Sequence, residues 1–261
     1  MLRSLKILLG DTVVAADGDI GKVHDFYFHD DTWIVRYLVV DTGHWLPGRK
    51  VLITPSALWK PDCDELTVPV ALTRRQVEKS PNIDTDQPVS RQQETALHNH
   101  YGWPMYWIDP GTGAWPAVAP MAPIFAPPKP SETATEGKAD PHLRSIREVT
   151  GYHIHASDGE MGHVEDFIVD DAFWVIRYMV VHTGNWLPAK KVLISPQWLG
   201  EIRHWERKVD VTLTQEQILH CPEFCPDAPV NRQYEERLYD YYGRPRYWQE
   251  PDHVAKKNEG C

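Results

Sequence analysis

Short apolar runs separated by turn residues occupy roughly the first seventy residues of the chain. The runs lie near residues 13–14, 21–28, 33–40, 51–53 and 68–72. Asp17-Gly18 separates the first two, and this pair supplies the positive φ angles of a tight hairpin turn. The third run, WIVRYLVVDTG, is apolar on both faces around one arginine, which is typical of a strand buried on most of its surface. About five or six short strands with tight turns predict a small barrel or a strongly bent sheet.

The period of the pattern changes after this region. Thr73 and Gln76 have the spacing of a capping box and predict a short helix. A second box at Ser90 and Gln93 opens a segment that ends at Gly102, where a C-cap glycine is expected. We therefore expect a small helical extension after the strands.

The whole pattern returns 141 positions later without a gap. Residues 2–107 align with residues 143–248, and by direct count about 47 of the 106 aligned positions are identical. Two segments this similar share one fold. We call residues 1–107 and 143–248 the first and second copies and predict that each is a domain, a small barrel plus its helical extension.

The copies are separated by a segment of different composition. Residues 108–142 are rich in proline and alanine, which disfavours helix and central strand, and predict a linker. The last residues, 249–261, predict a polar tail.

Charge and apolar run length limit the classes of function. The net charge is −10, and acidic residues outnumber basic ones in each copy, so neither copy has the basic excess that a nucleic-acid backbone requires. No run approaches the roughly 20 apolar residues of a membrane span, and the first residues do not have the pattern of a signal peptide. We expect a cytoplasmic protein without an integral membrane segment.

The cysteines do not form a repeated framework. They lie at positions 63, 221, 225 and 261, where the other copy has none, so reduced thiols are expected. His220, Cys221 and Cys225 nevertheless place one imidazole and two thiols within six positions, and His204 or Cys261 is a candidate fourth ligand. A zinc site here is one alternative and ordinary thiols in a loop the other.

Two segments of the first copy carry a family resemblance. They are DGDIGKVHDFYFHDDTWIVRYLVVDTG and WLPGRKVLITPSAL, and their counterparts are DGEMGHVEDFIVDDAFWVIRYMVVHTG and WLPAKKVLISPQWL. This order of turn glycine, strand, tryptophan-led strand and basic residue before Val-Leu-Ile resembles the PRC-barrel domain. That domain is named for the cytoplasmic part of the photosynthetic reaction centre H subunit and also occurs in a ribosome maturation factor. The resemblance covers about residues 3–75 and 144–216, and the helical extension resembles that of tandem PRC-barrel proteins of bacteria.

The resemblance implies a protein-interaction, scaffold or regulatory module, since PRC barrels are known as assembly domains. It also raises peripheral association with a photosynthetic or electron-transfer complex. The residues agree with a role other than catalysis, because none of the thirteen histidines aligns with a histidine in the other copy and Ser4 and Ser145 do not lie in a glycine elbow. We expect no enzyme activity and no cofactor; a small-ligand sensor is a further alternative.

Three pairs of shared residues are candidates for interaction: Asp25 with Asp166, Arg36 with Arg177, and Trp45 with Trp186. Neighbouring strands would let each aspartate pair with the arginine of its copy, which is the structural interpretation. In the functional one, the arginines bind an acidic group of a partner. The tryptophans precede Leu-Pro in a loop, where they either anchor a partner or close the end of the barrel.

The predicted architecture is mainly β, with two small PRC-type barrels, each followed by a short helical extension, packed as a fused pseudo-dimer. Its expected partner is an unidentified protein. The two barrels are expected to associate with each other, and a homodimer of the whole chain is a further possibility.

Overall fold

A computed structural model describes the chain except for residues 60–65, 84–88, 108–141, 185–188 and 250–261. Nearly all of the predicted linker and tail therefore lie outside the described residues. The same is true of Trp186, Cys63 and Cys261.

The first copy contains six strands and three α-helices in its described residues. They are β1 (Leu2–Ser4), α1 (Leu5–Leu8), β2 (Thr12–Ala15), β3 (Gly18–His29), β4 (Ile34–Asp41), β5 (Lys50–Ile53), the 3-10 turn η1 (Pro55–Ala57), β6 (Thr67–Pro69), α2 (Arg74–Glu78) and α3 (Arg91–Tyr101). The predicted capping boxes are both present, at Thr73 and Ser90. Helix α3 ends at Gly102 in the left-handed conformation, as predicted.

The second copy repeats this order with one additional strand and one additional 3-10 turn in its described residues. Its elements are β7 (Leu143–Ser145), α4 (Ile146–Val149), β8 (His153–Ala156), β9 (Gly159–Asp170), β10 (Val175–His182), β11 (Lys191–Ile194), η2 (Pro196–Trp198), β12 (Leu199–Arg203), η3 (His204–Glu206), β13 (Lys208–Val211), α5 (Gln215–His220) and α6 (Arg232–Tyr242). Strands β12 and β13 form a hairpin with η3 at its tip.

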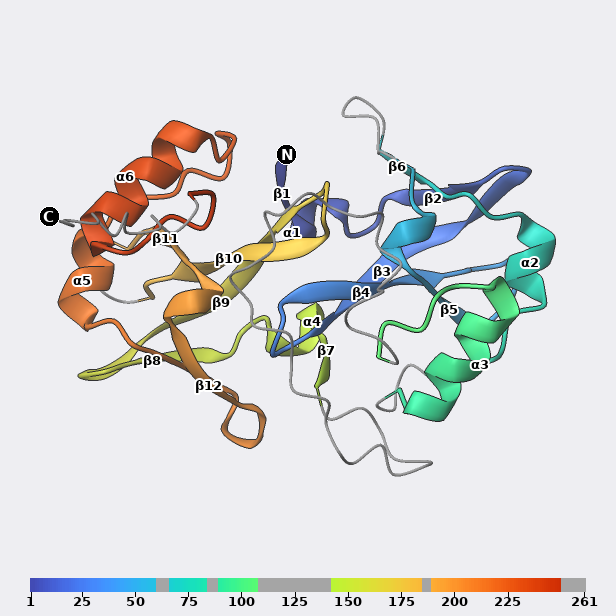
Figure 1. Ribbon diagram of the computed structural model, residues 1–261, viewed down its shortest axis with the longest axis horizontal. Coiled ribbons are helices and arrows are strands. Elements are labelled where there is room, and N and C mark those ends of the chain that lie inside the picture. Colours follow the sequence, from blue (N-terminus) through green and yellow to red (C-terminus); the bar gives the residue numbers. More distant parts are fainter. Residues whose placement is uncertain (60–65, 84–88, 108–141, 185–188, 250–261) are drawn as a thin grey trace, which may run out of the picture.

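The described strands of both copies belong to one curled sheet. Its order is β12-β13-β8-β9-β10-β4-β3-β2-β6, and the copies meet where β4 pairs with β10 at Ile34 and Val175. In Figure 1 this sheet crosses the middle of the molecule, with α2 and α3 at one end and α5 and α6 at the other. The structure is thus mainly β, with a curled half-barrel and some helices, and two separately closed barrels are not shown.

The first strand of each copy lies in the other half of the sheet. Strand β1 pairs with β9, with Arg3 opposite Val169, and β7 pairs with β3, with Arg144 opposite Phe28. Figure 1 shows this exchange by colour, since the blue β1 lies beside the yellow strands of the second copy and the yellow-green β7 beside the blue strands of the first. The two copies therefore complete each other.

Aromatic side chains fill the junction between the copies. Phe26 stacks on Trp174 with ring centroids 6.0 Å apart, and Phe28 packs between Trp33 at 5.2 Å and Phe167 at 5.8 Å. All five are buried. Rings of this size contribute much of the stabilisation of a core, so the junction is a shared hydrophobic core.

Two tryptophans at the junction adopt a backbone conformation that bulky residues rarely take. Trp33 has φ 58° and Trp174 has φ 53°. The carbonyl oxygen of Trp33 accepts from Ile176 N at 2.8 Å, and that of Trp174 accepts from Val35 N at 2.8 Å. Hydrogen bonds across the junction and burial of both rings thus offset the strain.

No helix in the described part of the chain is long and apolar enough to cross a bilayer.

Candidate functional site

The predicted aspartates lie at the contact between the copies. Asp25 Oδ2 accepts from Ser145 Oγ at 2.5 Å, and Asp25 Oδ1 accepts from Arg147 N at 3.3 Å and from Phe26 N at 2.7 Å. Ser145 is the N-cap of α4, so the buried carboxylate of the first copy supports a helix end of the second.

Asp166 makes the same contacts in the opposite direction. Its carboxylate accepts from Ser4 Oγ at 2.5 Å, from Lys6 N at 2.9 Å and from Phe167 N at 2.7 Å. Ser4 is the N-cap of α1. The two aspartates are thus a reciprocal pair of caps, each serving the helix of the other copy.

The predicted ion pairs between these aspartates and the arginines of their copies are wrong. Among the described side chains, neither aspartate forms an ion pair with Arg36 or Arg177. Burial raises the pKa of both carboxyl groups above the ordinary aspartate value, and the hydrogen bonds from the serines and the backbone oppose that rise. The physical reason is the strand register, since Asp25 lies opposite Val39 and Asp166 opposite Val180, each three residues from the arginine of its copy.

Arg36 lies under the helical extension of its own copy. Its guanidinium is 4.0 Å from the ring centroid of Tyr106. Tyr106 and Tyr37 both donate their hydroxyls to Glu94, at 2.7 and 2.8 Å, and Arg91 contacts the same carboxylate at 2.7 Å. Burial raises the pKa of both tyrosines, and the nearby Glu94 carboxylate raises it further.

The second copy has the same cluster. Arg177 lies 4.4 Å from the Tyr247 ring centroid. Tyr178 and Tyr247 donate to Glu235 at 2.7 and 2.8 Å, and Arg232 contacts Glu235 at 3.0 Å. Because both copies keep this buried arrangement, it attaches the helical extension to the sheet, and in it the arginines contact aromatic rings of their own chain.

Trp45 was predicted either to anchor a partner or to close the end of the barrel, and its position is intermediate between these two. Its ring is half-buried, packs at the edge of the core and lies 4.6 Å from the Arg74 guanidinium. Its counterpart in the second copy, Trp186, lies outside the described residues.

The most exposed tryptophan is one that the sequence patterns did not identify as a site. Trp205 is 103% exposed at the tip of the β12–β13 hairpin. In the first copy, Trp59 and Leu66 are 59% and 77% exposed in the equivalent stretch between η1 and β6. Trp205 aligns with Asp64, so comparison of the copies gives no signal for it.

Ion pairs surround the base of this hairpin. Arg203 contacts Asp210 at 2.6 Å and Glu206 at 2.8 Å. Lys208 contacts Glu160 of strand β9 at 2.6 Å. Individual surface pairs contribute little, but this network gives the hairpin that carries Trp205 a defined position against the sheet.

The segment considered for zinc does not bring its ligand atoms together. Cys221 is buried, Cys225 is exposed, and His220 Nδ1 lies 2.9 Å from the carbonyl oxygen of Glu216. Burial raises the pKa of the Cys221 thiol, which disfavours the thiolate that zinc requires. Within the described residues, the one group of three potential ligands with atoms mutually within 4.8 Å is elsewhere, at residues 29–31.

Comparison with known proteins adds one finding. No curated protein matches the chain. The PRC-barrel domain model matches residues 4–61, which run from the end of β1 past η1. These residues carry the turn glycines, the tryptophan-led strand β4 and the Val-Leu-Ile strand β5. Residues 4–61 of this chain are a PRC-barrel domain.

Proposed function

We propose that the protein is a non-catalytic protein-interaction scaffold, built as a fused pseudo-dimer of two PRC-type units, with a regulatory or assembly role. One continuous sheet and a shared aromatic core support a frame in which the two copies keep a fixed relation. Such a frame presents two similar surfaces at a fixed distance, which suits a partner with two binding elements.

The observation that carries this proposal is the position of Trp205. An indole exposed on all sides at a hairpin tip contributes nothing to the core of this chain. Tryptophan is enriched among the residues that dominate protein–protein binding energy. Trp59 and Leu66 put exposed apolar surface on the matching stretch of the first copy, so both copies offer a contact of the same kind.

Photo-crosslinking tests this role. A photoreactive phenylalanine analogue replaces Trp205 in the full chain, which is expressed in its native cells and irradiated. We expect one protein to crosslink at this position. We also expect that protein to co-purify with the tagged unmodified chain and to be lost from Trp205→Ala, without a change in the melting temperature. Because the resemblance includes a reaction centre subunit, electron-transfer complexes are the first candidates.

The control places the same analogue at Ile7, which is 65% exposed on α1. Recovery of the same proteins from both positions would show that the crosslinks are non-specific. Recovery of none from position 205, or full co-purification of the captured protein with Trp205→Ala, would contradict the proposal.

A further inference from the structure

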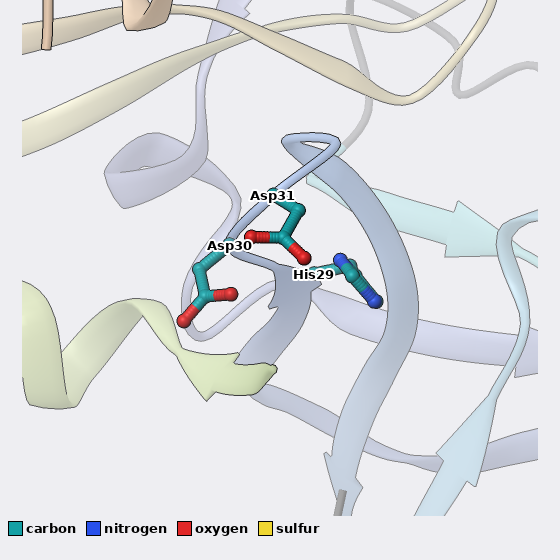
Figure 2. Close-up of side chains that lie close together, drawn as sticks. All are labelled: His29, Asp30 and Asp31. Atoms are coloured by element: carbon teal, nitrogen blue, oxygen red, sulfur yellow. The ribbon is translucent and has the colours of Figure 1, made fainter. Parts of the chain in front are cut away.

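The last residue of β3 and the turn that follows it provide three consecutive residues with metal-binding side chains. These are His29, Asp30 and Asp31, whose potential ligand atoms all lie within 4.8 Å of one another. Figure 2 shows the Asp31 carboxylate directed toward the His29 ring, with Asp30 beside them on the same turn. His29 is buried, Asp30 half-buried and Asp31 exposed, so the cluster opens toward solvent on the side of Asp31.

Two imidazoles from later in the chain lie near this cluster, His142 directly before the second copy and His204 within it. His142 Nδ1 lies 2.9 Å from Asp30 Oδ1 and 3.3 Å from Asp31 Oδ2. Its ring stacks on that of His29, with centroids 5.3 Å apart. His204 Nε2, from η3, lies 3.5 Å from Asp30 Oδ2. Three imidazoles and two carboxylates from separate parts of the chain thus converge at the junction of the copies.

The equivalent turn of the second copy shows which contacts at this turn are common to both copies. It reads Asp170-Asp171-Ala172, and Asp171 contacts Arg3 at 2.8 Å and the Met1 amino group at 2.5 Å. In the first copy Asp30 contacts Arg144, the counterpart of Arg3, at 3.0 Å.

The pairing of aspartate with arginine is therefore common to both turns. The contact of His142 with Asp30 also has a counterpart, in the contact of the Met1 amino group with Asp171. His29 and Asp31 have none, because the aligned residues are aspartate and alanine. This fold forms the turn without them in the second copy, so their convergence in the first requires another explanation.

We propose that His29, Asp30, Asp31 and His142 form a binding site for a divalent transition metal ion of the zinc type. Mixed imidazole and carboxylate ligands suit zinc, and imidazole favours it over magnesium or calcium. Two ligands bound to one tetrahedral zinc at 2.0–2.2 Å lie about 3.4 Å apart. The distances from His142 Nδ1 to the two carboxylates, 2.9 and 3.3 Å, are close to that value.

The ion pair with Arg144 is compatible with a bound ion. Arg144 Nε contacts Oδ2 of Asp30, whereas His142 faces Oδ1. One oxygen thus remains with the arginine, which orients the carboxylate, while the other faces the site. His204 approaches the same oxygen as Arg144, on the side away from His142 Nδ1.

The test uses the full chain, zinc chloride as the probe, isothermal titration and native mass spectrometry. We expect one equivalent of zinc to bind, and magnesium chloride to produce no binding at the same concentrations. Asp31→Ala combined with His142→Met should weaken zinc binding at least tenfold. Ala172 and Met1 are the aligned residues at the equivalent turn, so we expect the variant to fold, with circular dichroism as the check. Zinc should also raise the melting temperature of the unmodified chain and not that of the variant.

Two controls separate this site from other zinc ligands. His155→Ala removes a half-exposed histidine that pairs with Asp210, outside the cluster, and should leave zinc binding unchanged. Cys221→Ser with Cys225→Ser should also leave it unchanged. The proposal is overturned if the full chain binds no zinc, if the Asp31 and His142 substitutions do not weaken binding, or if the cysteine variant abolishes it. The result does not depend on whether a protein partner is captured at Trp205.

Discussion

The hydroxyl of Ser145 donates a hydrogen bond to the buried carboxylate of Asp25, although the two residues are 120 positions apart. Ser4 and Asp166 form the same contact in reverse. Each pair joins the first strand and helix of one copy to the long strand of the other. These contacts make the stability of each copy depend on the presence of the other.

Removal of either serine hydroxyl should destabilise the whole molecule. Ser145→Ala leaves the Asp25 carboxylate with one donor fewer and removes the side-chain N-cap of α4, and we expect a loss of about 1–3 kcal/mol in the free energy of unfolding. Urea denaturation measures it. Ser56→Ala, which removes an exposed hydroxyl near Thr54, should change stability by less than about 0.5 kcal/mol. Equal effects of the two variants would contradict the cap interpretation.

The reciprocal aspartates should give stability an unusual pH dependence. Their pKa values are raised in the folded state, so their contribution is fully present below the unfolded value of 3.8 and is lost as pH rises through the folded pKa. Asp25→Asn combined with Asp166→Asn removes this dependence. Relative to the unmodified chain, the variant should therefore gain stability as pH rises from 4 toward neutrality, as measured by urea denaturation at each pH.

Asp210 provides the opposite control for that experiment. Burial acts to raise its pKa, but the Arg203 and His155 contacts outweigh burial, so the pKa in the folded state is lowered. Its contribution is present above the unfolded value and is lost as pH falls through the folded pKa. Asp210→Asn should accordingly lose stability relative to the unmodified chain as pH rises. The same sign for both variants would refute the assignment.

Two glycines with positive φ should respond differently to alanine. Gly162 has φ 58°, and a Cβ there would overlap the backbone carbonyl oxygen of His182. Gly151 has φ 89°, and a Cβ there would meet no atom within 4 Å. Gly151→Ala should cost only the conformational strain, about 1–2 kcal/mol. Gly162→Ala should cost clearly more, because β9 and β10 must also separate, and thermal unfolding of both variants compares them.

Replacing the buried Glu94 of α3 by glutamine and by alanine should destabilise the protein to different degrees, because glutamine removes only the charge and alanine removes the whole polar group. Glu94→Ala removes the buried carboxylate that Arg91 and two tyrosine hydroxyls share and should cost about 3–5 kcal/mol. Glu94→Gln keeps one acceptor oxygen and should cost less. The loss of helical circular dichroism on heating, compared with tyrosine fluorescence, measures whether α3 detaches from the sheet before the sheet unfolds. An alanine variant as stable as the glutamine variant would contradict this.

Local features of the fold were predictable from the sequence. The strands and the capping boxes at Thr73 and Ser90 depend on neighbouring residues, so short patterns identify them. The exchange of first strands does not leave such a pattern. Both β1 and β7 have the sequence Leu-Arg-Ser, and either can pair with β3 or β9 by sequence alone.

The contacts at the candidate sites were also not predictable from short sequence patterns. The pairing of Arg36 with Asp25 was predicted from neighbouring strands, yet the guanidinium packs on Tyr106, seventy positions later in the chain. The cluster at residues 29–31 was not predicted, because two of its three residues differ between the copies and His142 joins it only in the folded chain. A comparison that looks for shared residues is insensitive to a site that only one copy has.

The exchange of β1 and β7 means that the unit repeated in the sequence is not the unit that folds. A polypeptide containing only residues 1–107 would have the β3 edge without β7, and its own β1 without the strand against which it lies. Two such polypeptides could satisfy both needs only by trading these segments, as subunits of a swapped dimer do. Joining the copies in one gene converts that encounter between molecules into an intramolecular one, so assembly no longer depends on protein concentration.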